Sequence, residues 1–193
     1  MVEIVRQGFA PANGGVTSQR RQRSRLGSNF GNRWQWTSDA IDGAKRRQGD
    51  RMPTAHLMFG FLGSGKTTLA KRLELEHSAV RFTPDEWMAR LFGEDPPADT
   101  FQHRAAAIRD IMQPIWVRCL SLGLDVILDY GFWSRAERDR VREVVADMGA
   151  TSVLWAVSCS DAEARKRIAL RNEAAHRSLY IAPATFDLLK ARV

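Results

Sequence analysis

The stretch GFLGSGKTT at residues 60–68 constrains the fold of this 193-residue chain more than any other. It satisfies the pattern G-x-x-x-x-G-K-[ST], in which a strand leads into a glycine-rich loop and a helix follows. An apolar strand is predicted just before the loop, at 56–59, and a helix just after it, at 66–77. The sequence therefore predicts a phosphate-binding loop at the edge of a sheet.

Each residue type in the loop suits the binding of a nucleotide. The glycines let the backbone approach phosphate groups without an intervening Cβ atom, and the amide groups of residues 63–67 point at the anion. Lys66 is expected to reach the β- and γ-phosphates, and the Thr67 hydroxyl is expected to ligate Mg²⁺. We predict ATP and Mg²⁺ as cofactors, with the nucleotide held by Gly60, Gly63, Ser64, Gly65, Lys66, Thr67 and Thr68.

The charge of the chain is distributed unevenly. Residues 1–52 carry 10 Lys and Arg against 4 Asp and Glu, whereas residues 53–193 carry 19 against 18. Residues 1–51 are rich in Gly, Ser, Asn, Gln and Arg, so we predict a disordered basic leader, and Met52 is an alternative natural start that would make the leader non-native. The near-neutral remainder offers little attraction for phosphate backbones, and we do not expect a nucleic-acid partner.

Targeting signals and metal-binding patterns are missing from the sequence. No apolar run is long enough for a membrane span, and the N-terminus lacks the apolar core of a secretory signal. Cys119 and Cys159 lie far apart, without the spacing of metal ligands, and are expected to be free thiols in a reducing compartment. We therefore predict a cytoplasmic protein without a membrane partner.

Strands and helices alternate from residue 53 onward. Further strands are predicted at 79–82, 124–129 and 151–158. The remaining helices are predicted at 84–93, 99–122, 135–148, 162–177 and 183–192. Asp99 is expected to cap the second of these, with a bend at Pro114, and Ser134 and Glu137 are expected to form a capping box for the third. This order predicts an α/β fold with a parallel sheet covered by helices on both faces.

Two aspartates follow predicted strands at the edge where ligands bind in such folds. Asp129 ends the segment VILD and is predicted to hold Mg²⁺ through water, with a strand-end turn residue as the alternative. Asp85 lies just beyond the strand at 79–82. It is suited either to accepting the proton of an acceptor hydroxyl or to stabilising the first turn of a helix, and its position alone does not decide.

Arginines and aromatic residues occur in two later segments. Arg167 and Arg171 are four residues apart on one helix face, where they could neutralise a triphosphate or form a solvated surface. Arg135 and Arg138 begin a helix, where cations oppose the helix dipole, and we predict that they bind an anion or the acceptor. Trp133 belongs to an aromatic set that would stack on a substrate ring or form core.

Four segments together resemble a known group of proteins. GFLGSGKTTLAKRLE, RFTPDEWMARLFG, GLDVILDYGFWSRAERDRVREVVADMGA and RKRIALRNE are similar to small P-loop kinases of the zeta-toxin and chloramphenicol-phosphotransferase-like group, which are often labelled AAA-family ATPases. The resemblance covers residues 54–192. It implies a three-layer, nucleoside-monophosphate-kinase-like fold, so that residues 52–193 would form one P-loop kinase domain. It also implies Asp85 as base and a lid helix with Arg165, Arg167 and Arg171.

The chain departs from this group at its C-terminus. Relatives continue past FDLLKAR to a last strand, whereas this chain stops at Val193, so we expect a sheet without its fifth strand and with an exposed edge. The expected function is ATP-dependent transfer of the γ-phosphate to a hydroxyl of a small-molecule acceptor, by a monomer or homodimer. The catalytic residues would be Asp85, Lys66, Arg167 and Arg171. The alternatives are a 5′-hydroxyl polynucleotide kinase and a non-catalytic ATP-binding protein with a truncated C-terminus.

Overall fold

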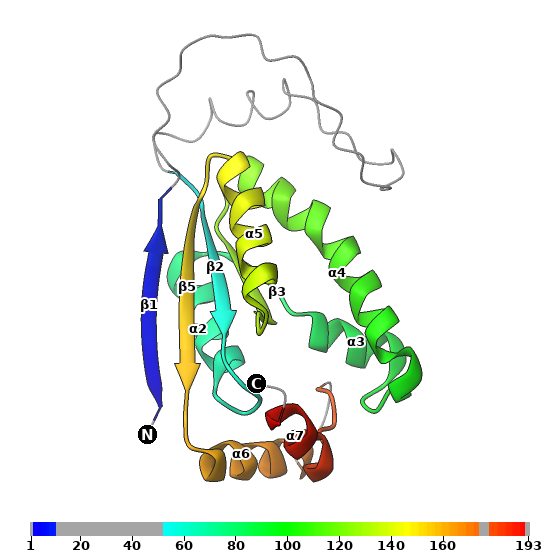
Figure 1. The fold of residues 1–193 in the computed structure, drawn as a ribbon. Helices are drawn as coiled ribbons and strands as arrows, with labels where there is room; N and C mark the ends of the chain where they lie inside the picture. Colours follow the sequence, from blue (N-terminus) through cyan, green and yellow to red (C-terminus); the bar gives the residue numbers. More distant parts are fainter. Residues whose placement is uncertain (1, 11–51, 174–177, 192–193) are drawn as a thin grey trace, which may run out of the picture.

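A five-stranded sheet forms the centre of the protein (Figure 1). The computed structural model describes residues 2–10, 52–173 and 178–191. The strand order is β1-β5-β2-β4-β3, in which β2 to β5 are mutually parallel and β1 runs antiparallel to β5. The strands span Glu3–Phe9 (β1), Thr54–Phe59 (β2), Val80–Phe82 (β3), Val126–Gly131 (β4) and Thr151–Ser158 (β5).

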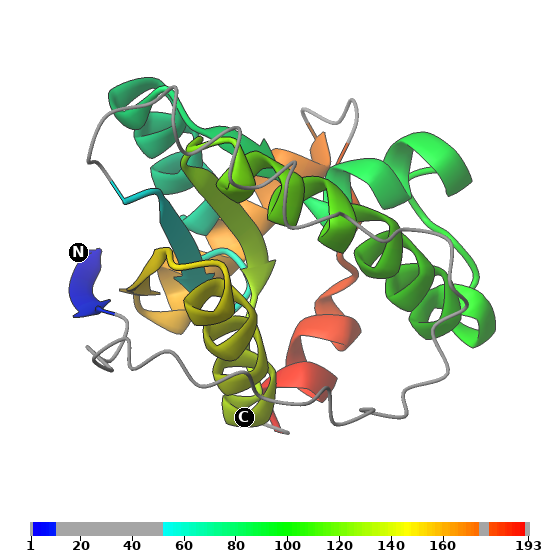
Figure 2. The same cartoon turned by 90° about the horizontal axis from the view of Figure 1, so that it is seen from above.

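Helices cover both faces of this sheet, as the sequence predicts. Helix α2 packs on one face, α4 and α5 pack on the other, and α3, α6 and α7 lie toward the carboxyl ends of the parallel strands (Figures 1 and 2). Their bounds are Lys66–His77 (α2), Pro84–Phe92 (α3), Ala98–Ser121 (α4), Arg135–Asp147 (α5), Asp161–Glu173 (α6) and Pro183–Lys190 (α7).

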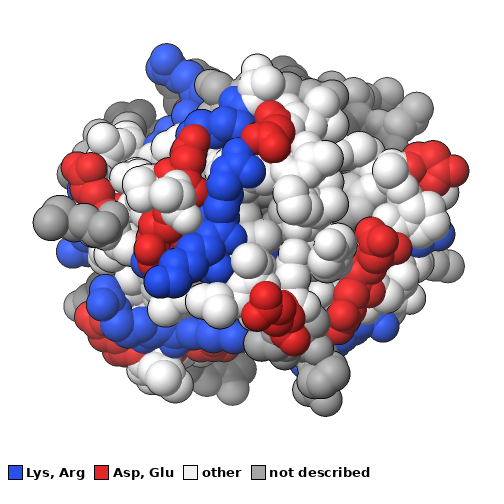
Figure 3. Space-filling model, turned by 90° about the horizontal axis from the view of Figure 1, so that it is seen from below, with Lys and Arg blue, Asp and Glu red and all other residues white. Residues whose placement is uncertain are grey.

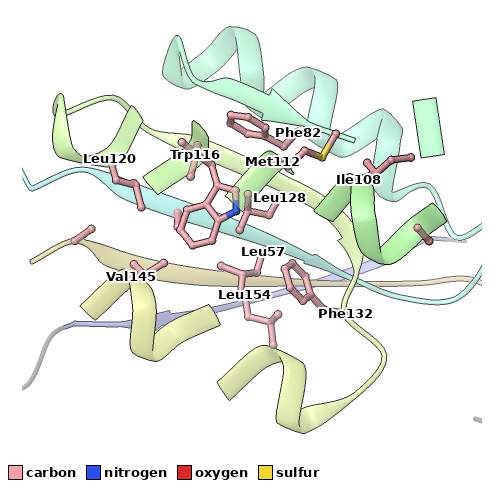
Figure 4. Packing of buried hydrophobic residues seen from close by; sticks show 14 of the residues in the cluster. Leu57, Phe82, Ile108, Met112, Trp116, Leu120, Leu128, Phe132, Val145 and Leu154 are labelled. Atoms are coloured by element: carbon pink, nitrogen blue, oxygen red, sulfur yellow. The ribbon is translucent and has the colours of Figure 1, made fainter. Parts of the chain in front are cut away.

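Alternating side chains of the central strands supply two separate cores. On β2, Leu57 joins the core under α4 and α5, whereas its neighbour Met58 joins the core under α2. Leu128 and Ile127 on β4 divide in the same way. The larger core receives Trp116 and Met112 from α4, both almost completely buried (Figure 4). This packing fixes the strand ends on which the site is built.

Two predicted helix caps differ from the structure. Asp99 lies in the first turn of α4, which begins after Pro97, and Pro114 is accommodated inside this helix. Ser134 occupies the N-cap of α5, but its side chain makes no capping hydrogen bond, so the predicted Ser134–Glu137 box is not formed. Both helices are held mainly by tertiary packing, which commonly overrides such local signals.

The edge of the sheet was predicted wrongly. Residues 3–9, which we expected to be disordered, form β1 and pair with β5 in a register that sets Ile4 opposite Val157 and Phe9 opposite Ser152. The edge of β5 is therefore covered by the N-terminal strand, and the sheet has five strands. The segment EIVRQGF is short, and its apolar and polar residues do not alternate regularly, so the sequence does not predict a strand there. In the structure all its residues are exposed. The rest of the expected leader, residues 11–51, lies outside the described residues.

Candidate active site

The glycine-rich loop joins β2 to α2 and packs against β5 and α6. Gly60, Gly63 and Gly65 all have positive φ angles, of 150°, 70° and 106°. A Cβ atom on Gly60 would lie 2.2 Å from the carbonyl oxygen of Val157, and one on Gly63 would lie 2.6 Å from that of Ala164. Only glycine fits at these positions. The loop is therefore held in its curved form by the end of β5 and the start of α6.

Lys66, the first residue of α2, lies among the charged groups of the site. Its ammonium group donates a hydrogen bond of 2.8 Å to the carbonyl oxygen of Phe61, across the loop. Burial lowers the pKa of Lys66, and the negative charges of Asp129 and Asp85 oppose this shift. One lysine thus interacts electrostatically with a carboxylate on β4 and with one that follows β3.

Asp129 and Thr67 fit a magnesium ion. Asp129 is only 6% exposed on β4, and one of its carboxylate oxygens, Oδ2, is buried without a hydrogen-bond partner in the described structure. Burial raises the pKa of Asp129, and the neighbouring Thr67 side chain opposes this shift. A buried carboxylate oxygen without a partner costs free energy, and carboxylate and hydroxyl oxygens are the hard ligands that Mg²⁺ prefers. The predicted donor set is therefore brought together.

Asp85 lies at the N-terminus of α3, in the same electrostatic neighbourhood. Its side chain is solvent-accessible, yet enough protein surrounds it that desolvation raises its pKa. The charges of Lys66, Arg171 and Arg109 act in the opposite direction and favour the carboxylate. A carboxyl group with a raised pKa beside several cations has the character of a general base.

The arginines of α6 have different surroundings. Arg167 donates a hydrogen bond of 3.3 Å to the carbonyl oxygen of Ser64 and is paired with Glu163, so it contacts the loop directly. Arg171 contacts the carbonyl oxygen of Leu179, and its charge acts on Asp85. Arg165 instead pairs with Asp187 and stacks on Phe186, both on α7. Two of the three predicted arginines therefore face the site.

The three residues after β4 that we predict to bind the acceptor have different contacts. The indole N–H of Trp133 donates a hydrogen bond of 3.0 Å to the carbonyl oxygen of Gly60, which ties the β4–α5 turn to the loop. Arg138 donates to the carbonyl oxygens of Phe132 and Trp133, so its guanidinium group stabilises this turn. Arg135 is largely exposed and is paired with Asp139. The cations that act most strongly on Asp85 in the described residues are Lys66, Arg171 and Arg109.

Arg109 lies near the site without having been predicted, whereas Tyr130 belongs to the same predicted aromatic set as Trp133. Arg109 lies on α4, and its charge acts on both Asp85 and Tyr130. Tyr130 follows Asp129 on β4, and its hydroxyl contacts the sulfur of Met112 at 3.7 Å. No local pattern marks an arginine in the middle of a long helix, because only the packing of α4 against the sheet turns this residue toward the site.

A second polar cluster lies at the other end of the strands. The side chains of His56, His77 and Asp125 offer metal-ligand atoms within 4.8 Å of one another. However, the indole of Trp155 donates a hydrogen bond to Nδ1 of His56, so the neutral ring carries its proton on Nε2. A metal-binding histidine usually donates through its second nitrogen instead. The hydrogen bonding therefore favours a structural role for His56.

Comparison with solved structures shows the same fold in other proteins. A candidate kinase from Chloroflexus aurantiacus J-10-fl aligns with a TM-score of 0.61 and 19% identity, over 74% of this chain and 80% of that chain. Two structures of the Pnkp1/Rnl/Hen1 complex, one described as an RNA repair complex, align with TM-scores of 0.53 and 0.59 at 19% and 20% identity. These matches cover 63% and 74% of this chain but only 40% and 44% of the other chains, so this chain spans less than half of their length.

The remaining comparisons concern the sequence and the membrane. In the described residues, no helix has the length and apolarity needed to cross a membrane. No curated protein matches the sequence significantly. A family model, described as an AAA domain, matches residues 56–193, which is well over half of the chain. The protein therefore belongs to the AAA domain family and is a small P-loop kinase-like protein.

Proposed function

We propose that the protein is an ATP-dependent phosphotransferase that moves the γ-phosphate of ATP to a hydroxyl group of a small-molecule acceptor. One observation carries this proposal. Lys66 of the phosphate loop interacts electrostatically with both Asp129, on β4, and Asp85, in the first turn of α3. In a protein that only binds a nucleotide, the first carboxylate would serve the metal and Asp85 would serve only the first turn of α3. The cations around Asp85 and its raised pKa support the role of a base instead.

The loop would hold the nucleotide, and the amides of residues 63–67 with Lys66 would bind its phosphates. Thr67 and Asp129 would hold Mg²⁺, which neutralises charge on the phosphates when bound. Ser64 and Thr68 complete the proposed nucleotide-binding set. Arg167, already in contact with the loop, and Arg171 would stabilise charge on the transferred group.

Asp85 would act on the acceptor. The acceptor oxygen forms a bond to the γ-phosphorus, the bond from that phosphorus to the bridging oxygen of ADP breaks, and the acceptor proton moves to the carboxylate of Asp85. The charges of Arg171, Arg109 and Lys66 favour the ionised carboxylate before the transfer. Trp133 would line the acceptor side while it holds the loop through Gly60.

A 5′-hydroxyl polynucleotide kinase is the second candidate. It is supported by the similarity to chains of an RNA repair complex. On the side of α6 and α7, a band of Lys and Arg side chains crosses the surface with Asp and Glu side chains beside it, and these acids would weaken the attraction of a phosphate backbone (Figure 3). A non-catalytic ATP-binding protein remains the third candidate. We propose a cytoplasmic location, since Cys119 and Cys159 are free thiols.

Transfer of radiolabelled γ-phosphate tests the proposal. The full chain is incubated with ATP and Mg²⁺ and with sugars, nucleosides, amino alcohols and 5′-hydroxyl oligonucleotides. The proposal predicts a labelled small-molecule product that disappears in Lys66→Ala. ATP binding without transfer to any acceptor would favour the non-catalytic candidate, and label found only in oligonucleotides would favour the second.

A further inference from the structure

A groove of about 420 Å³ lies between the middle of α4 and the first turns of α5. Its volume is that of a site for a small molecule rather than for an extended polymer. Its lining is polar and carries charges of both signs. The residues that line it are Ala106, Arg109, Asp110, Ser134, Ala136, Glu137 and Arg140.

Arg109 connects this groove to the transfer site. The same side chain that lines the groove acts electrostatically on Asp85 and on Tyr130. The negative charge of Glu137, which lies on the opposite wall of the groove, also acts on Tyr130 and raises its pKa. Tyr130 packs against the core under α4 and α5. Arg109 is therefore the side chain that the groove shares with the charged cluster around Asp85.

The two arginines of the groove have no protein partner in the described part of the chain. Arg109 and Arg140 make no hydrogen bond or ion pair there. The other arginines of α5 do have partners, because Arg135 and Arg142 pair with Asp139 and Arg138 binds backbone carbonyls. A half-buried guanidinium group such as that of Arg109 gains most from an anion that it can bind with two hydrogen bonds.

The acids of the groove limit the kind of anion. Asp110 and Glu137 balance the two arginines, so the lining has no net charge. A nucleic-acid backbone requires a row of cations, one for each phosphate that is neutralised. A molecule with one anionic group and several hydroxyl or amino groups suits this lining better, because the two carboxylates can accept hydrogen bonds from those groups.

We infer that the groove between α4 and α5 is the acceptor subsite, and that Arg109 binds an anionic group of a small hydroxylated acceptor while the hydroxyl of that acceptor faces Asp85. This inference rests on the proposed function and specifies its substrate class. Arg109 is a binding residue in this account. Its loss weakens the binding of anionic acceptors and leaves the binding of ATP unchanged.

Matched acceptor pairs test the inference. Ribose 5-phosphate is compared with ribose, and glycerate with glycerol, for each variant on the plateau of its own profile of rate against pH, so that a change in the ionisation of Asp85 does not enter the comparison. The anionic member of each pair should be phosphorylated with kcat/KM at least about tenfold higher. Arg109→Gln should raise the KM for the anionic member about tenfold and change kcat less. Arg104→Gln removes the same charge from α4 outside the groove, where Arg104 stacks on Phe92, and should change neither constant.

The outcomes separate this inference from the proposed function. Equal use of neutral and anionic acceptors, or an unchanged KM in Arg109→Gln, would overturn the inference and leave phosphotransfer standing. Transfer to 5′-hydroxyl oligonucleotides alone would overturn it in favour of nucleic acid. If no acceptor is phosphorylated, binding of ribose 5-phosphate is measured by calorimetry in the presence of a non-hydrolysable ATP analogue. Binding that Arg109→Gln abolishes would support the subsite without phosphotransfer, and no binding would overturn it.

Discussion

At the scale of single residues, Asp129 is an ionisable side chain at a buried position, where a neutral side chain would stabilise the fold more. Asp129 is buried, one of its carboxylate oxygens has no hydrogen-bond partner in the described structure, and its pKa is raised above the ordinary value. An acid whose pKa is higher in the folded than in the unfolded state destabilises the fold at neutral pH, because ionisation favours the unfolded chain. This is the pattern expected of a residue retained for a ligand.

Asp129→Asn should therefore stabilise the ligand-free protein while it weakens magnesium-dependent nucleotide binding. We expect the free energy of unfolding in urea to rise by about 1 kcal/mol at neutral pH without metal. The difference from the unmodified protein should fade as the pH falls through the raised pKa of Asp129, since the carboxylate is then protonated in the folded state. A loss of stability at neutral pH would mean that Asp129 supports the fold.

The individual loop residues were predictable from the sequence, whereas Arg109 was not. The loop is a local pattern, and Asp85 and Asp129 follow from the strand ends that precede them. Arg109 is one of several exposed or half-exposed charges along α4, and nothing near it in the sequence distinguishes it from Arg104. Its place in the site depends on how α4 packs against β4 through Met112 and Trp116.

At the scale of elements, α6 brings positive charge to the base. Arg171 lies on α6 and its charge lowers the pKa of Asp85, which desolvation raises. The carboxylate must be ionised to accept a proton, so activity should fall at acidic pH with an apparent pKa above the ordinary range of aspartate. Arg171→Gln removes a cation, makes the carboxylate less stable and should move this acidic limb to higher pH.

Profiles of kcat/KM against pH measure this effect. Arg171→Lys keeps the charge and should preserve the position of the acidic limb, whatever it does to the absolute rate. Arg165→Gln removes an arginine from the same helix that is paired with Asp187, and it should not move the limb either. An acidic limb at the same pH in Arg171→Gln would show that α6 does not tune Asp85.

At the scale of the whole molecule, the sheet is completed by its N-terminal strand. The alternation of strands and helices from β2 to α7 was predictable because each element carries its own apolar period. Strand β1 was not, because its structure depends on pairing with β5, which lies some 150 residues later in the chain. Arg6 of β1 stacks on Trp155 of β5, and Arg142 of α5 stacks on Phe9. The strand thus contacts the domain that we placed at 52–193, a boundary that remains a prediction.

Deletion of residues 1–10 should destabilise the protein and uncover an aggregation-prone edge. The free energy of unfolding should fall by about 2 kcal/mol, since β5 loses its outer partner. Nucleotide affinity should fall as well, because the end of β5 packs on the loop at Gly60. Thermal unfolding measures the loss of stability, light scattering measures aggregation, and calorimetry measures the affinity for ATP. Arg6→Ala keeps the strand, so it should lower the free energy of unfolding by less than the deletion does. A deletion variant as stable as the full chain would show that β1 is dispensable.

The central claim is that Asp85 is the base of a phosphotransfer reaction, and Asp85→Asn tests it most directly. The measurement is the single-turnover rate of γ-phosphate transfer to the best acceptor, together with the Kd for ATP in the presence of Mg²⁺. We expect the rate to fall by about 10²-fold or more while the Kd for ATP changes by no more than a few-fold. A variant that transfers phosphate at the original rate, or that loses ATP binding and transfer equally, would contradict it.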